Sequence, residues 1–261
     1  MEIAYTRAGS GVPLVLLHAF PLSSEMWGAQ RGGLSREAEV ITVDQRGFGE
    51  STGPDAFADA PPDMNVVAED LASVLDRLEP RRVVLGGLSM GGYVAMAFLR
   101  RHADRVRGLI LANTKASADT PEAAANRLRI ADSVERAGDC ELLVTELEPK
   151  LLGGDSRRRD PELVRRVTSM LRAAPPDAVA WAQRAMAARP ESFDVLRGLE
   201  VPVLVVAGEQ DALMARAEAE AMASAVRDAE LVLIPGAGHL SALEAPREFN
   251  AAASGFLKRF S

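Results

Sequence analysis

Continuous apolar runs alternate with stretches of helical periodicity along the first 115 residues of the chain. Three apolar runs are typical of strands buried on both faces of a sheet: 12–17, 40–43 and 106–111. Residues 65–79 and 94–99 repeat apolar side chains at helical spacing, and residues 2–7 alternate as an edge strand does. This order predicts an α/β protein with a mostly parallel sheet and helices on both faces.

The alternation stops after Asn113 and resumes near residue 201. From about residue 116 to 190 the pattern predicts helical segments rich in Ala, Arg and Glu, separated by Gly and Pro turn signals. Two further strands and two helices are then predicted, at 201–207, 218–226, 231–234 and 246–260. We therefore expect an α/β core domain from residues 1–115 and 191–261, with residues 116–190 inserted as an all-helical subdomain.

Composition narrows the class of protein. With 261 residues, 48% of them hydrophobic, the chain can bury one large core and carry an insertion. A net charge of −7 argues against a nucleic-acid partner. The N-terminus lacks the apolar region of a signal peptide, and no apolar run approaches the ~20 residues of a spanning helix. We expect a cytoplasmic protein that binds neither nucleic acid nor membrane, and the oligomeric state stays open.

Cysteine and histidine are scarce. The single Cys140 excludes an intramolecular disulfide and suits a reducing compartment, and its neighbours Asp139 and Glu141 favour an unreactive thiol. Three histidines without metal-ligand spacing make a metal site unexpected.

The segment 83–99 carries the strongest candidate chemistry. Gly87-Leu-Ser89-Met-Gly91 lies between an apolar run and a helical pattern. Gly-x-Ser-x-Gly alone is a weak motif, but between a strand and a helix it is typical of a sharp turn that exposes a nucleophilic serine. The flanking residues must then be small, because the helix turns back against the strand. The alternative, a glycine-rich turn with an incidental serine, depends on whether partners for Ser89 exist.

A serine nucleophile needs a base, and the base needs an orienting acid. His102 ends the helix after Ser89 and faces away from it, and His18 is expected to organise a turn after the first buried strand. His239 follows the last predicted strand, at the edge of a parallel sheet where sites form, and is the candidate base. Asp211 follows the preceding strand and fits the order serine, acid, histidine, with Glu209 as its competitor.

Five segments together identify a resemblance. The sequence resembles the α/β-hydrolase fold family with a helical cap in His18-Ala-Phe-Pro, Asp44-Gln-Arg-Gly-Phe-Gly-Glu-Ser, Gly87-Leu-Ser-Met-Gly, Gly208-Glu-Gln-Asp and Gly236-Ala-Gly-His. They span nearly the whole chain, and residues 116–190 are the unmatched cap. Some relatives place the acid where Asn113 stands, which favours Asp211 here. Ala19 stands where the family usually has glycine, and its side chain narrows the turn that follows the first buried strand.

The resemblance implies the remaining site residues. The oxyanion hole would consist of the backbone N–H groups of Met90 and Phe20, whose side chains would also form apolar walls of the pocket. The resemblance implies no cofactor. Trp181 is the largest candidate for a substrate contact in the cap, with helix packing as the alternative. The family context makes Asp44-Gln-Arg46 a salt-bridged turn that ties adjacent strands together.

The implied function is that of a serine hydrolase that cleaves small carboxylic esters or lactones through an acyl-enzyme. The sequence resembles enol-lactonase-like esterases and also cofactor-free perhydrolases (non-haem haloperoxidases), whose oxyanion loop is similar around Pro21. Haloalkane dehalogenases and epoxide hydrolases need an aspartate where Ser89 stands. A perhydrolase, a carbon–carbon bond hydrolase and a slow-turnover small-molecule receptor remain alternatives, because one fold serves several functions.

Overall fold

The computed structural model describes residues 1–53, 56–58, 60–80 and 82–260. Its centre is a seven-stranded sheet in the order β1-β3-β2-β4-β5-β6-β7, in which β1 runs antiparallel to β3 and the other neighbours are parallel. The strands are β1 (Tyr5–Ala8), β2 (Val12–Leu17), β3 (Ala38–Val43), β4 (Val83–Leu88), β5 (Val106–Ala112), β6 (Val203–Gly208) and β7 (Ala229–Ile234). The mostly parallel sheet predicted from the apolar runs is confirmed.

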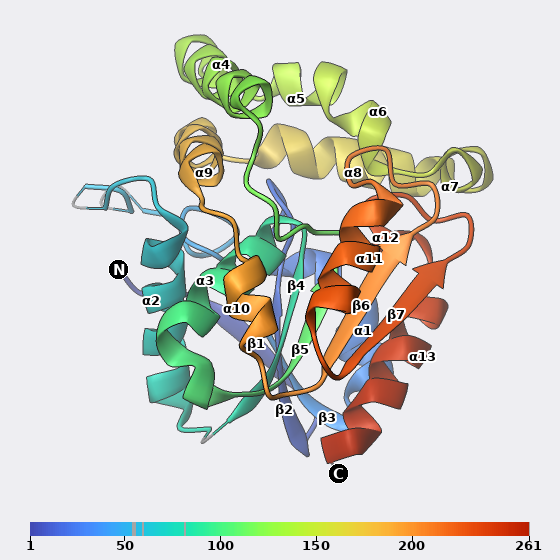
Figure 1. Cartoon of the computed structure of the whole chain (residues 1–261). Coiled ribbons are helices and arrows are strands. Elements are labelled where there is room, and N and C mark those ends of the chain that lie inside the picture. The colour runs from blue at the N-terminus through green and yellow to red at the C-terminus, as the bar shows by residue number, and fades with distance from the viewer. Residues whose placement is uncertain (54–55, 59, 81, 261) are drawn as a thin grey trace.

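Helices cover both faces of this sheet (Figure 1). On one face lie α1 (Gly28–Leu34) and α13 (Pro246–Leu257), and on the other lie α2 (Met64–Leu78), α3 (Met90–His102) and α11 (Arg216–Ala225). Shorter elements join them: α10 (Phe193–Arg197), α12 (Ser241–Glu244) and the 3₁₀ turns Ser24–Trp27, Ala103–Arg105 and Lys258–Phe260. Among the described residues, no helix combines the length and the apolar character that crossing a membrane requires.

The position of β2 in the interior of the sheet explains why its sequence is apolar throughout. Successive side chains point to opposite faces of a strand. Val15 and Leu17 join the hydrophobic cluster under α2 and α3, whereas Leu14 and Leu16 join the cluster under α1 and α13. Both faces of β2 are therefore buried.

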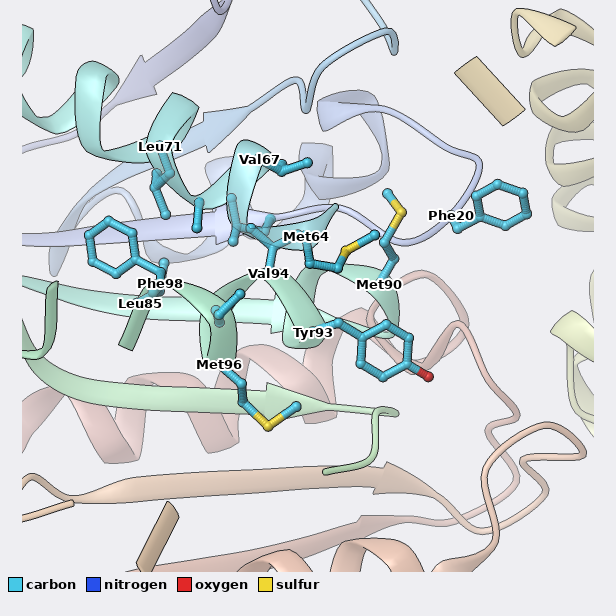
Figure 2. Packing of buried hydrophobic residues seen from close by; sticks show 14 of the residues in the cluster. Phe20, Met64, Val67, Leu71, Leu85, Met90, Tyr93, Val94, Met96 and Phe98 are labelled. Atoms are coloured by element: carbon cyan, nitrogen blue, oxygen red, sulfur yellow. The ribbon is translucent and has the colours of Figure 1, made fainter. Parts of the chain in front are cut away.

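The cluster under α2 and α3 also positions the loop that follows β4. Figure 2 shows Val67 and Leu71 of α2 near Val94 and Phe98 of α3, with Leu85 of β4 in the same cluster. Burial of each large apolar side chain contributes about 1.5 to 3 kcal/mol. The start of α3 is thus held firmly against the sheet.

A second layer of helices lies between β5 and β6 in the sequence. These elements, which we call the cap helices, are α4 (Pro121–Ala137), α5 (Glu141–Glu146), α6 (Glu148–Leu151), α7 (Gly154–Arg159), α8 (Pro161–Ala173) and α9 (Pro176–Ala188). They gather at the top of Figure 1, beyond the carboxyl ends of the parallel strands. Local sequence sets their ends: the Thr120 side chain accepts the N–H of Ala123 at the start of α4, and Gly138, with φ 68°, ends it. The helical pattern predicted for residues 116–190 is confirmed.

The turn after β3 differs from the prediction in one respect. Asp44 accepts backbone N–H groups from Ser24 and Glu50, so it does organise the turn. Arg46, however, pairs with Asp70 of α2 at 2.6 Å. The prediction that this salt bridge ties adjacent strands is wrong, because the guanidinium reaches across to a helix that covers the sheet.

Candidate active site

Ser89 occupies a strained turn between β4 and α3. Its backbone has φ 54° and ψ −113°, outside the region that L-residues prefer. A Cβ on Gly87 would lie 2.2 Å from the backbone of Gly91, and a Cβ on Gly91 would lie 2.2 Å from the carbonyl oxygen of Leu17. Both positions therefore require glycine, which is the physical basis of the motif.

His239 and Asp211 lie together on the loops after β7 and β6. Because these strands are parallel neighbours, their carboxyl ends bring the two loops side by side. The Nδ1 atom of His239 is 2.9 Å from Oδ2 and 3.1 Å from Oδ1 of Asp211. Both side chains are nearly inaccessible to solvent, at 3% and 2% exposure. Of the two candidate acids, the structure brings Asp211 to the histidine, whereas the N–H of Glu209 bonds the carbonyl oxygen of Ile234 and its side chain is exposed.

The electrostatic surroundings keep Asp211 ionised. Burial acts to raise the pKa of this carboxyl, but the facing His239 and hydrogen bonds from Asn113 and the N–H of Met214 outweigh burial and hold the pKa below its ordinary value. A carboxylate on Nδ1 fixes the orientation of the ring and directs Nε2 away from the acid. Nε2 is then free to accept a proton.

Asn113 is a site residue whose role the sequence did not reveal. It has φ 44° at the end of β5, and its Nδ2 donates to Oδ2 of Asp211 at 2.9 Å and to the carbonyl oxygen of Gly238 at 3.1 Å. Its Oδ1 accepts the hydroxyl of Ser241. The amide of Asn113 therefore connects the loop that carries Asp211 to the loop that carries His239. The sequence held one signal for this role: a polar residue at the end of a strand, next to the loops that carry Asp211 and His239.

Glu244 is a second residue of the candidate site whose role the sequence did not reveal. Its buried carboxylate accepts the backbone N–H groups of Gly238 at 2.9 Å and Leu240 at 3.1 Å, on either side of His239. The same carboxylate accepts the N–H of Gly153, between α6 and α7 of the cap, at 2.8 Å. The histidine loop is therefore fixed partly by the cap.

The loop of the acid has its own link to the cap. Gln210 Nε2 donates to Oδ2 of Asp155 at 2.8 Å, and the backbone N–H of Asp155 donates to Oε1 of Gln210 at 3.1 Å. The N–H of Leu240 also donates to the carbonyl oxygen of Leu151. One stretch of the cap, residues 151–155, thus contacts both loops.

The other two histidines lie where the sequence predicts. His18 Nε2 accepts the N–H of Gln45 at 3.0 Å and is fully buried, and this burial lowers its pKa to about 4. It is a neutral residue that organises the turn. His102 lies at the far end of α3, within 3.2 Å of Glu69.

A cavity of about 250 Å³ separates the sheet edge from the cap helices. Ser89 and His239 both line it, together with Phe20 from the loop after β2. Much of the remaining wall is apolar and comes from the cap, with contributions such as Ile130, Leu143 and Met186, and from the loop after Asp211, with Leu213 and Met214.

The three residues predicted to contact the substrate, Phe20, Met90 and Trp181, lie in different surroundings. Phe20 lines the cavity and extends toward the cap helices in Figure 2. The Met90 side chain belongs to the buried cluster with Met64 and Val94, and Met90 is not among the described residues that line this cavity. Its backbone N–H still lies at the first position of α3.

Trp181 packs the cap against the core rather than facing the cavity. Its ring stacks on Phe57 with centroids 5.3 Å apart, and its Nε1 donates to the carbonyl oxygen of Ala60 at 2.9 Å. Gln183 and Met186 are the α9 residues that line the cavity. At about 100° per residue, they lie on a different side of the helix from Trp181.

The chain belongs to the Alpha/beta hydrolase family, whose sequence profile matches residues 14–252. The sheet order and the helices on both faces agree with this assignment. The resemblance identified from the motifs is confirmed at this level.

Particular relatives add detail. The structure is similar to that of a thermophilic esterase from Thermogutta terrifontis with malate bound, with a TM-score of 0.93 and 42% identity, covering 98% of this chain and 93% of that one. The sequence is 29% identical over 253 residues to pimeloyl-(acyl-carrier protein) methyl ester esterase of Nitrosospira multiformis, covering 92% of each. It is 28% identical over 233 residues to 3-oxoadipate enol-lactonase 1 of Acinetobacter baylyi, covering 89% of this chain and 84% of the relative. The protein thus has a hydrolase fold with esterase and lactonase homologues.

Proposed function

We propose that this protein is a serine hydrolase that cleaves small carboxylic esters or lactones through an acyl-enzyme. The observation that carries the proposal is that His239, which is hydrogen-bonded to Asp211, lines the same cavity as Ser89. The esterase and enol-lactonase named among the relatives support the same class of substrate.

In the proposed reaction Ser89 is the nucleophile. Its Oγ attacks the carbonyl carbon while Nε2 of His239 takes the hydroxyl proton, and Asp211 stabilises the imidazolium that forms. This transfer needs a hydrogen bond between Oγ and Nε2, and such bonds often tighten only when the substrate binds.

The tetrahedral oxyanion needs hydrogen-bond donors. We assign this role to the backbone N–H groups of Met90, at the positive end of α3, and Phe20, in the loop after β2. Each donor of this kind contributes ~3 kcal/mol to transition-state stabilisation. Phe20 also supplies apolar contact to the substrate.

Collapse of the intermediate completes acylation. His239 returns the proton to the departing alkoxide oxygen, and the alcohol leaves. A water molecule then gives a proton to His239 and attacks the acyl-enzyme, which releases the acid and restores Ser89. We assign residues 116–190 as the cap that closes the cavity during these steps, and the cytoplasm as the location.

A burst-phase assay tests the function. Wild type and Ser89→Ala are compared on p-nitrophenyl acetate, butyrate and octanoate, with Ser35→Ala as a control at a partly exposed serine at the end of α1. We expect Ser89→Ala to lose at least about 10³-fold in kcat and Ser35→Ala to match wild type. Full activity in Ser89→Ala would overturn the proposal, and a single slow burst without turnover in wild type would indicate the receptor alternative.

A further inference from the structure

One wall of the cavity is charged. Three cationic and two anionic side chains line it: Lys115, Arg127, Lys150, Asp119 and Glu146. An apolar pocket is enough for an esterase of small, uncharged substrates, whereas this cavity has a charged wall. Two of its cations, Lys115 and Arg127, pair with the carboxylate of Asp119.

The side chain of Asp119 is only 2% exposed. It pairs with Lys115 at 3.1 Å, Arg127 at 2.5 Å and Arg189 at 2.9 Å. Burial acts to raise its pKa, but Arg189 and Arg127 hold the pKa well below the ordinary value. Asp119 therefore stays ionised, yet one negative charge faces three positive charges.

The nearby acids do not balance this excess. Glu146 pairs with Arg129, and Glu218, which accepts the hydroxyl of Ser117, offsets one of the positive charges at most. Arg189 is itself buried, with its guanidinium 3.9 Å from the ring centroid of Tyr93. Positive charge is thus left over at the cavity wall, in a region partly shielded from water, where an anion is bound more strongly than in bulk solvent.

Two of the cations retain hydrogen-bond donors. The Nζ atom of Lys115 lies 3.1 Å from Oδ1 of Asp119, and an ammonium carries three N–H donors. Arg127 uses Nε for Asp119 and Nη1 for Gln183 and Met186, which leaves Nη2. The two side chains are 17% and 20% exposed, so their heads reach the cavity.

The end of β5 places this wall close to the nucleophile. Asn113 donates to Asp211, and the hydroxyl of Thr114 donates to the carbonyl oxygen of Ser89 at 2.8 Å. Lys115 is the next residue and lines the cavity. Ser89 and Lys115 therefore follow neighbouring strands and line the same cavity.

We propose that the cavity is selective for esters or lactones that carry a free carboxylate, which Lys115 and Arg127 bind. The inference rests on the function proposed above and narrows its substrate class to half-esters of dicarboxylic acids and lactones of similar charge. The apolar residues between Ser89 and the cations hold the intervening methylene groups. Asp119 and Arg189 position the two cationic side chains.

A pair of matched substrates tests the inference. Monomethyl glutarate and methyl pentanoate have acyl chains of the same length and differ in the terminal carboxylate. Rates of methanol release are measured for wild type, Lys115→Met and Arg127→Met. The control is Arg136→Met, at an exposed position of the same helix as Arg127, where the guanidinium donates to the carbonyl oxygen of Asp132. Asp119 keeps two cationic partners in either variant, so both are expected to fold.

We expect wild type to prefer the half-ester. Lys115→Met and Arg127→Met should each lower kcat/KM for monomethyl glutarate by about 10- to 100-fold and leave methyl pentanoate nearly unchanged, because a charge-assisted hydrogen bond is lost only with the anion. Arg136→Met should change neither rate. Equal losses on both substrates would overturn the recognition role.

Binding gives a readout that is independent of turnover. Glutarate, the dicarboxylate product, should raise the Tm of wild type and of Ser89→Ala, but not of Lys115→Met. If wild type hydrolyses methyl pentanoate through Ser89 but shows no preference for the half-ester, the carboxylate-binding proposal is wrong and the serine-hydrolase proposal is supported. If neither ester is cleaved while glutarate binds through Lys115, the serine-hydrolase proposal is wrong and the carboxylate-binding proposal is supported.

Discussion

The carboxylate of Glu244 accepts the backbone N–H of Gly153 at 2.8 Å, across the border between the sheet domain and the cap helices. The same group accepts the N–H groups of Gly238 and Leu240, on either side of His239. A single buried side chain therefore fixes the position of the candidate base and anchors the cap beside it.

Glu244→Gln tests this anchor. The amide offers one acceptor oxygen where the carboxylate offers two, and its NH₂ group faces a backbone N–H. Since a buried donor left unpaired costs about 1 to 3 kcal/mol, we expect the free energy of unfolding to fall by that amount, measured in urea. We also expect kcat to fall about 10-fold, because His239 becomes less well placed. Glu248→Gln, at an exposed position of α13, serves as the control, and unchanged kcat in Glu244→Gln would contradict the positioning role.

Asn113→Asp probes the surroundings of Asp211. The change removes the Nδ2 donor and places a second carboxylate next to Oδ2 of Asp211. Like charges at this distance raise a carboxyl pKa, so the acid limb of the pH profile of kcat/KM should move to higher pH. At neutral pH we expect a loss of at least about 10-fold. Asn65→Asp, on the distant helix α2, should leave the profile in place.

His18 makes stability depend on pH. Its folded-state pKa is lowered by burial to about 4, from an unfolded value of 6.5. The unfolded chain therefore binds a proton first, so stability is fully present above pH 6.5 and is lost as the pH falls toward 4. A difference of this size corresponds to about 3 kcal/mol. Urea unfolding at several pH values should show this slope in wild type and in His102→Gln, and a much flatter one in His18→Gln.

Two glycine substitutions should have opposite effects. A Cβ on Gly91 would lie 2.2 Å from the carbonyl oxygen of Leu17, so Gly91→Ala should cost about 3 kcal/mol or more and displace Ser89. A Cβ on Gly255, inside α13, meets nothing within 4 Å. Gly255→Ala should stabilise the protein by about 0.5 to 1 kcal/mol, because alanine is the better helix former. Thermal unfolding distinguishes the two, and a stable, active Gly91→Ala would contradict the steric account of the turn.

The fold was predictable because its signals are local. The apolar run at Val12–Leu17 reports burial on both faces of β2, and the Gly and Pro residues between the cap helices report where these end. The candidate nucleophile and its proposed partners could be selected for a similar reason, since each lies in the segment that follows a strand. Ser89, Asp211 and His239 were chosen from the order of the strands, and their roles stay predictions.

Residues that act through long-range contacts were not predictable in the same way. Asn113 reaches Asp211 across 98 residues of sequence, and Gly153 reaches Glu244 across 91. Neither pairing has a periodic pattern in the sequence. The side of α9 that faces the cavity depends on how the cap lies on the sheet, so the size of Trp181 was a poor guide to substrate contact.

The contacts made by residues 151–155 have a consequence for recombination between relatives. This stretch of the cap is bonded to the acid loop through Gln210 and to the histidine loop through Glu244. A cap transplanted from another hydrolase would have to bring a backbone N–H to Glu244, and a backbone N–H and a side-chain acceptor to Gln210, at the same positions. Functional chimeras should therefore require the exchange of three segments as one unit: the cap, the loop around Asp211 and the loop from Gly236 to Glu244.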